Sequence, residues 1–336
     1  MNLVARRTVG VSVLSLLLTL SLVLPANAGV RQMALGVSMA NSRDLSGLDN
    51  FTNHMGGQKP AIWALWSDWG AAASDTNSGS AFPTATALEL AGRGVTTMIN
   101  WEPTHPDPNM QNCENWSLAS ILSGKYDSYI RKWATAARDF GGRVIVRFAH
   151  EMNGYWYTWG DQRCTNTPKK FRKAWKRVVN IFRGPNGVGA TNVRFLWSVF
   201  GPYKASYFYP GDAYVDYMGL TAFNWAQPGH PKWMSMVKTM APTMSALRSI
   251  SATKPIIAAE MGAGYNPNCA VCDKPAYITN GYPAVYTKWP QMAAMVYFNI
   301  DMRGLEQPDW RLESPTGALN AYKNVVFDSR FQGTIP

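Results

Sequence analysis

The chain has 336 residues, of which 46% are hydrophobic and 12% aromatic, and its formal net charge at pH 7 is +11. So much apolar and aromatic material suits a large folded core and excludes an intrinsically disordered chain. Beyond residue 28 no stretch approaches about 18 consecutive apolar residues, which excludes a transmembrane helix there.

The N-terminal residues are typical of a secretory signal peptide. A basic start at Arg6-Arg7 precedes an apolar core over Val9–Val23, and Ala26-Asn27-Ala28 has the small-residue pattern of a cleavage site. We therefore expect residues 1–28 to be removed. The mature domain, residues 29–336, is then expected to be secreted as an extracellular monomer without a membrane anchor.

Eight short apolar runs follow, and helical patterns separate them. The runs read as buried strands because apolar and polar residues do not alternate within them. They are Met33–Val37, Ala61–Leu65, Val95–Trp101, Arg143–Phe148, Val193–Trp197, Tyr217–Phe223, Pro255–Ala259 and Met295–Phe298. Strand and helix in eightfold repetition predict a single-domain α/β fold, the (β/α)8 barrel. A doubly wound sheet is the alternative, although no Gly-rich dinucleotide turn is found.

Apolar residues at helical spacing predict helices over Tyr126–Phe140, Lys169–Arg183 and Pro231–Ile250. Thr167 and Pro168 are a cap and a first-turn residue for the second of these helices. Seven positive residues lie on that helix, opposite its apolar face. We interpret them as a solvated face and not as a nucleic-acid site, because the aromatic residues of the helix face inward. Attraction to an acidic cell-wall surface is the alternative.

An even number of cysteines in an exported chain indicates disulfides. Cys269 and Cys272 lie in one loop and are expected to pair, which leaves Cys113 to pair with Cys164. A zinc site would need further ligands, but the four histidines are scattered. We expect no metal and no cofactor.

Aromatic and polar residues stand at the ends of the predicted strands. In a barrel these ends meet at one rim, where active sites lie. Carboxylates and amides bond sugar hydroxyls there, while flat aromatic rings stack on sugar C–H faces, so the expected partner is a polysaccharide. The candidate substrate-binding residues are Trp101, Glu102, Asn153, Trp156, Trp159, Trp225 and Asn299.

Two carboxylates end strands that lie nearly opposite each other in such a barrel, Glu151 on the fourth and Glu260 on the seventh. Glycosidic bond cleavage uses such a pair: one acid protonates the leaving oxygen, and the other group activates water or attacks the anomeric carbon. Neighbouring aromatic residues, Tyr155 and Trp156, should keep Glu151 protonated as the acid.

Two basic residues precede Glu151. Arg147 is expected to stabilise an ionised Glu260, although a structural ion pair with Glu151 is an equally simple interpretation. His150 is expected either to bond the nucleophile or a sugar hydroxyl, or to be a satisfied structural histidine.

Three motifs resemble glycoside hydrolase family 26. They are R-F-A-H-E-M-N-G-Y-W-Y-T-W-G from Arg147, A-A-E-M-G from Ala258, and Y-F-N-I-D with D-W-R-L-E-S from Tyr297 and Asp309. The resemblance implies a (β/α)8 barrel and a retaining mechanism. By match, Glu151 resembles the acid/base and Glu260 the nucleophile. Arg147 and His150 resemble supporting polar residues, and Trp156 an aromatic platform.

One position departs from the family pattern. After the sixth strand the family usually has a tyrosine whose hydroxyl bonds the nucleophile, but this chain has Phe223. Losing one hydrogen bond to a charged group costs roughly 1.5–3 kcal/mol. Either turnover suffers, or Tyr265 or Tyr297 supplies the hydroxyl.

These observations predict a secreted retaining endo-β-glycosidase. The family contains β-mannanases, mixed-linkage β-glucanases and β-1,3-xylanases, and we place β-1,4-mannan first and mixed-linkage β-1,3-1,4-glucan second. The alternatives are a carbohydrate-binding barrel with weakened catalysis, which only Phe223 favours, and a transglycosylase that uses the same intermediate.

Overall fold

A computed structural model describes residues 31–70, 81–227 and 232–335. The chain from Gln32 onward forms one compact unit, and the expected signal peptide lies outside the described residues. Eight parallel strands pair in chain order and close into a barrel, because β1 also pairs with β8. The predicted single-domain (β/α)8 fold is therefore confirmed, and the doubly wound sheet is excluded.

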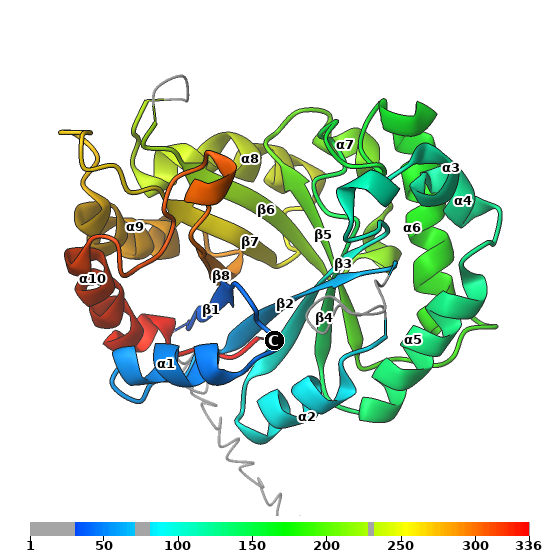
Figure 1. The fold of residues 1–336 in the computed structure, drawn as a ribbon, viewed down its shortest axis with the longest axis horizontal. Coiled ribbons are helices and arrows are strands. Elements are labelled where there is room, and N and C mark those ends of the chain that lie inside the picture. The colour runs from blue at the N-terminus through cyan, green and yellow to red at the C-terminus, as the bar shows by residue number, and fades with distance from the viewer. Residues whose placement is uncertain (1–30, 71–80, 228–231, 336) are drawn as a thin grey trace, which may run out of the picture. The chain divides into compact units, whose positions relative to one another are not determined.

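Helices surround the strands (Figure 1). The strands are β1 (Ala34–Met39), β2 (Ile62–Asp68), β3 (Thr96–Glu102), β4 (Val144–Phe148), β5 (Val193–Phe200), β6 (Tyr217–Asn224), β7 (Ile256–Ala263) and β8 (Met292–Asn299). The longer helices are α1 (Ser46–His54), α2 (Thr84–Gly92), α5 (Asp127–Phe140), α6 (Pro168–Arg183), α8 (Met236–Ile250), α9 (Lys274–Lys288) and α10 (Thr316–Phe327). Short helices α3 (Cys113–Trp116), α4 (Leu118–Leu122) and α7 (Ala205–Phe208) lie in the connections. No described helix is long and apolar enough to cross a membrane.

Strand residues face two separate cores, because successive side chains point to opposite faces of a sheet. One set fills the barrel interior: Ala34, Ile62, Ala64, Met98, Ile145, Leu196, Tyr217, Ile257, Ala259, Ala294 and Val296, joined by Ile335. The alternate positions, such as Trp63, Val146 and Trp197, pack in the larger outer layer with residues of the surrounding helices. This alternation decides which residues reach the rim from inside the barrel.

Side-chain caps mark the starts of α6 and α8, whereas α5 begins without one. Thr167 accepts a hydrogen bond from the Lys170 amide, and α6 starts at Pro168 as predicted. α5 starts one residue after its predicted start. α8 begins only at Met236, where Ser235 caps its first turn; the predicted start, Pro231, lies outside the described residues.

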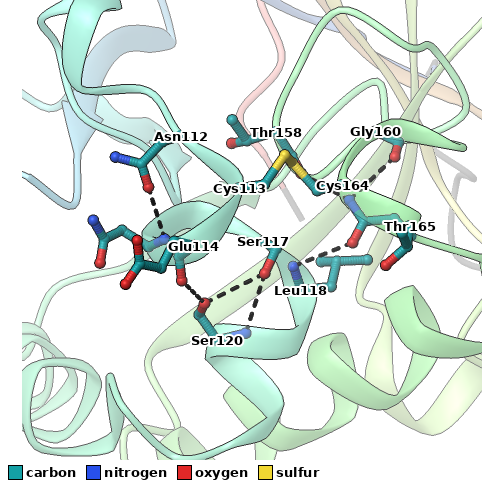
Figure 2. Close-up of a disulfide and its surroundings, with 12 residues drawn as sticks. Asn112, Cys113, Glu114, Ser117, Leu118, Ser120, Thr158, Gly160, Cys164 and Thr165 are labelled. Carbon is teal, nitrogen blue, oxygen red and sulfur yellow. Dashed lines mark hydrogen bonds between the residues drawn. A yellow bond between two sulfur atoms is a disulfide. The ribbon is translucent and has the colours of Figure 1, made fainter.

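Both predicted disulfides are present. Cys113 and Cys164, with Cα atoms 5.1 Å apart, join the start of α3 to the 3₁₀ turn Arg163–Thr165 (Figure 2). Beside this bond the Asn166 side chain accepts from the Leu118 amide and donates to the Gly160 carbonyl. Cys269 and Cys272 close a short loop before α9. The first disulfide therefore ties together the connections that follow β3 and β4.

Candidate active site

The guanidinium of Arg147 connects the two predicted catalytic carboxylates. It is fully buried, and its Nη1 lies 3.0 Å from Oε2 of Glu260 while its Nη2 lies 3.9 Å from Oε1 of Glu151. Its remaining bonds go to Asn100 Oδ1 at 3.1 Å and Thr221 Oγ1 at 2.9 Å, which fix its orientation. The nearer partner is Glu260, so Arg147 is more than a structural partner of Glu151.

The turn after β4 places Glu151. Ala149 and Glu151 have φ values of 42° and 53°, a left-handed conformation that non-glycine residues rarely adopt and that costs of order 1 kcal/mol or more each. Tertiary hydrogen bonds hold the turn: the Glu151 amide donates to the Ser198 carbonyl at 2.8 Å, and Trp159 Nε1 donates to the His150 carbonyl at 2.8 Å. The residue that carries the carboxyl group is thus one of two strained residues in this turn.

A β-bulge places Glu260. In β7 the pairing moves from Leu220 with Ala258 to Thr221 with Glu260, so Ala259 is an extra residue on this strand. Ala259 belongs to the barrel interior, and simple alternation would turn Glu260 outward. The bulge turns it inward instead, to Arg147, and the alternation resumes with Met261 in the outer layer.

The two carboxyl groups differ in their environments. Burial and the charge of Glu260 raise the pKa of Glu151 to about 7, against the opposing effects of Arg147, Thr221 and Trp156. Trp156 Nε1 donates to Glu151 Oε2 at 3.2 Å, so this aromatic residue lowers the pKa that we expected it to raise. Glu151 therefore retains its proton to higher pH, as an acid requires, because burial outweighs the hydrogen bond from Trp156.

One carboxylate oxygen of Glu260 forms an ion pair with Arg147, and the other has no described hydrogen-bond partner. Glu260 Oε1 is buried and has no hydrogen-bond partner. Phe223 packs against Phe298 and Trp310, with ring centroids 5.3 and 4.6 Å away, and has no hydroxyl to offer. Among the described hydrogen bonds, neither Tyr265 nor Tyr297 donates to Glu260 either. The structure leaves the position of the expected donor unfilled.

His150 belongs to a second polar group beside the glutamates. Its Nε2 lies 3.2 Å from the Tyr157 hydroxyl and 3.6 Å from Glu102 Oε1. Burial, reinforced by Arg147, lowers the pKa of His150 well below its usual value, so the ring is neutral. Burial and the neighbouring Asp68 raise the pKa of Glu102 well above its usual value. Both shifts oppose a charged pair between His150 and Glu102, and His150 has no described bond to Glu260.

Four of the predicted substrate-binding residues are buried and support other parts of the structure. Trp101 is fully buried in the outer layer, stacked on Trp133 of α5, because its neighbour Asn100 takes the inward position. Trp159 is also fully buried. Asn153 holds the β5 connection with both ends of its amide, through Phe200 and Tyr203.

Asn299 is the fourth of these supports. It is buried, and its amide oxygen accepts from the Leu312 backbone at 2.6 Å. For Trp101 and Trp159, which are fully buried, the structure gives the prediction of substrate contact no support; for Asn153 and Asn299, which are as buried as Glu260, it stays a prediction. Trp156, which is 41% exposed, and the partly exposed Glu102 and Trp225 lie where a ligand can reach them.

Sequence reasoning missed several residues of the site. Asn100 and Thr221 orient Arg147, Tyr157 contacts His150, and Trp310 packs against both Phe223 and Trp225. Asn100 and Thr221 would have been identified if it had been known which residues of β3 and β6 point into the barrel. Within the described residues, no group of three or more His, Cys, Asp and Glu side chains is arranged to hold a metal ion.

Comparisons with known proteins agree with this geometry. Residues 114–260, which include both glutamates, match the family model for glycosyl hydrolase family 26. The chain is 32% identical over 242 residues to endoglucanase H of Acetivibrio thermocellus, covering 69% of this chain and 24% of that protein. It is 29% identical over 126 residues to a mannan endo-1,4-beta-mannosidase of Bacillus subtilis, covering 34% of this chain and 33% of that protein. The chain thus spans a third or less of these relatives.

Solved structures share the fold. A family 26 β-mannanase from Bacteroides ovatus aligns with a TM-score of 0.65 at 15% identity, covering 91% of each chain. The catalytic domain of an endo-beta-1,4-mannanase from Bacillus sp. JAMB-750 aligns with a TM-score of 0.66 at 17% identity, covering 90% of this chain and 87% of that one. With the match to the family model, and with two glutamates joined by one arginine at the rim of a (β/α)8 barrel, residues 114–260 of the chain belong to glycosyl hydrolase family 26.

Proposed function

We propose that the protein is a retaining endo-β-glycosidase that hydrolyses a neutral cell-wall polysaccharide, with Glu151 as acid/base and Glu260 as nucleophile. The observation that carries the proposal is the unequal contact of Arg147 with the two carboxyl groups. An ionised carboxylate beside a protonated one is what a double displacement needs at its start.

The reaction has two steps. Glu151 donates its proton to the glycosidic oxygen, the bond from that oxygen to the anomeric carbon breaks, and a carboxylate oxygen of Glu260 bonds the anomeric carbon. Glu151, now a carboxylate, then takes a proton from water, and the resulting hydroxide displaces Glu260 from the sugar.

The same contacts support the change of role between the steps. The charge of Glu260 is one of the main causes of the raised pKa of Glu151. Once Glu260 is esterified to the sugar, that charge is gone and only burial opposes the ionisation of Glu151. The pKa of Glu151 is then lower than before, so its carboxylate form is favoured and it acts as the base of the second step.

The substrate class follows from the relatives. The longest of the matches described above is to a protein named endoglucanase H, whereas the match to the mannosidase covers half as much of this chain. We therefore place mixed-linkage β-1,3-1,4-glucan first and β-1,4-mannan second, the reverse of the order expected from the sequence. We further propose that the protein is secreted and acts as a monomer, with the signal-like residues 1–28 as support.

The test is reducing-sugar release by the protein on barley β-glucan, lichenan, carboxymethyl cellulose, glucomannan, galactomannan and β-1,3-xylan. We expect release on a glucan, and a loss of at least about 10³-fold in the Glu260→Ala variant, because no covalent intermediate forms without the nucleophile. Thermal unfolding serves as the control for folding. Equal activity of the folded variant and the wild type contradicts the role of Glu260, and release on mannans alone contradicts the substrate order.

A carbohydrate-binding barrel with lost catalysis is the second candidate. The unpartnered Glu260 Oε1 beside Phe223 favours it, because a carboxylate that lacks a donor is a less well-positioned nucleophile. Retention on one polysaccharide without release on any of the six identifies that function. A transglycosylase is distinguished by longer products at high acceptor concentration.

A further inference from the structure

A groove of about 540 Å³ lies on the outer wall of the barrel, between α5 and α6. The two helices run side by side there (Figure 1). Four basic side chains line the groove, Arg131 from α5 and Lys173, Lys176 and Arg177 from α6, together with one carboxylate, Asp127. A neighbouring hollow of about 670 Å³ shares Arg131 and extends along α5. We call the first hollow the α5–α6 groove.

The groove carries an excess of positive charge that its own contacts do not neutralise. Arg177 pairs with Asp127 through two hydrogen bonds of 2.8 and 2.5 Å, so the charges of these two residues neutralise each other. Arg131 donates to the Asn186 carbonyl, and Lys176 lies over the Tyr214 ring. These contacts supply partial charges only. Lys173 is exposed and has no described ion pair.

The rest of the lining suits a sugar chain. Asn180 and Asn186 expose side-chain amides, which donate to and accept from hydroxyl groups. Leu122, which is partly exposed, contributes an aliphatic surface on which a C–H face of a pyranose can rest. The volume lies within the range of about 300–1,000 Å³ that small-ligand sites occupy. Cations, amides and an aliphatic floor together match a polymer that carries carboxylates on pyranose rings.

We propose that the α5–α6 groove binds an acidic polysaccharide, a chain that contains uronic acid residues. The groove lies outside the barrel, whereas Glu151 and Glu260 project from strands to its inside, so both sites can be occupied at once. Binding there holds the protein on an acidic matrix while the rim acts on a neutral polymer. The proposal does not depend on the proposed catalytic activity, because binding requires no turnover.

The test measures affinity for polygalacturonate by affinity electrophoresis and by titration calorimetry at low salt. The groove variant is Arg131→Gln/Lys173→Gln/Lys176→Gln, which leaves the Arg177–Asp127 pair intact. The control variant, Lys238→Gln/Arg248→Gln/Lys288→Gln, makes the same change of net charge on α8 and α9, on a different wall of the barrel. We expect the groove variant to lose about tenfold in affinity, and the control to stay within about twofold of the wild type.

Three further measurements sharpen the test. Wild-type affinity should fall as salt rises from about 20 to about 300 mM, because exposed charges are screened. Galactomannan should not compete for the groove, and the Glu260→Ala variant should bind polygalacturonate as the wild type does. A linear polyphosphate should bind more weakly than polygalacturonate, because it offers charge without sugar hydroxyls or C–H faces.

Several outcomes overturn the proposal. Equal losses in the groove and control variants mean that net charge alone attracts the polymer. Polyphosphate binding as tight as polygalacturonate binding means a general anion site, and no wild-type binding at low salt means no site. If the triple variant melts at a lower temperature than the wild type, the single variant Lys173→Gln replaces it, and an affinity unchanged by that substitution counts against the groove.

Discussion

One arginine contacts two neighbouring acids unequally. Arg147 lies 3.0 Å from Glu260 and 3.9 Å from Glu151, and all three side chains are buried. Burial and the charge of Glu260 raise the pKa of Glu151 to about 7, and the more distant guanidinium opposes this only in part. The proposed roles of Glu151 as acid and Glu260 as nucleophile rest on this difference in contact.

A hydrogen bond from Trp156 lowers the pKa of Glu151. Trp156 Nε1 donates to Glu151 Oε2 at 3.2 Å, and this bond favours the ionised form. In Trp156→Phe the bond is lost, so the pKa of Glu151 should rise further above about 7. Since the acid must be protonated, activity falls as pH rises through this pKa, and the basic limb of kcat/KM should move to higher pH. The shift should stay below about one pH unit, because the indole is partly exposed.

The matched control is Tyr155→Phe. Tyr155 is the neighbouring aromatic residue, 75% exposed, with no described hydrogen bond to Glu151. Its pH profile should follow that of the wild type. A basic limb that moves to lower pH in Trp156→Phe, or that moves equally in both variants, contradicts the role given to the Trp156–Glu151 bond.

The sequence could predict which charged residues lie together at the rim, but only part of how they affect one another. Glu151, Glu260 and Arg147 were identified because strand ends and motif spacing are local properties of the chain. The causes of the raised pKa of Glu151 were not, because burial and the charge of Glu260 depend on residues more than a hundred positions apart. Nor could a sequence pattern tell that, among the described hydrogen bonds, neither Tyr265 nor Tyr297 compensates for Phe223.

At the level of elements, the strands could be predicted, but not which of their residues point into the barrel. Parallel strands of a barrel are buried on both faces, so apolar residues occupy inward and outward positions alike. Trp101 and Asn100 are adjacent, and only the structure shows that the asparagine points inward and the tryptophan outward. The bulge at Ala259 and Glu260 could not be predicted either. It interrupts the alternation of inward and outward side chains along β7, and a run of apolar residues does not reveal that alternation.

The disulfides should differ in their effect on stability. The Cys113–Cys164 bond closes a loop of sequence separation 51, whereas Cys269–Cys272 spans a separation of 3. By loop entropy, Cys113→Ser/Cys164→Ser should lower the free energy of unfolding by about 4 kcal/mol, and Cys269→Ser/Cys272→Ser by about 2 kcal/mol or less. Urea unfolding of both variants measures the difference. A larger loss from the short loop contradicts this account.

At the scale of the whole molecule, one end of the barrel carries the two glutamates and the other end is closed by the C-terminal segment. The glutamates lie at the carboxyl ends of the strands, while the C-terminal segment closes the opposite end. There the Met33 amide donates to the Arg330 carbonyl at 2.8 Å, and Ile335 joins the inner core. The eightfold alternation of the sequence predicted the barrel, but it gave no sign that a residue 300 positions from the first strand would fill its floor.

This division predicts that stability and activity can be changed separately. Ile335 is 4% exposed and packs on the interior cluster with Ile62 and Val296. Ile335→Ala should lower the free energy of unfolding by about 2–5 kcal/mol, because it leaves a cavity among buried side chains. At 25 °C kcat should equal that of the wild type, since no catalytic residue contacts the floor. Urea unfolding beside initial-rate measurements tests both statements, with Glu260→Ala as the opposite case, in which activity is lost and the fold retained. A several-fold fall in kcat of folded Ile335→Ala would show that the floor and the rim are coupled.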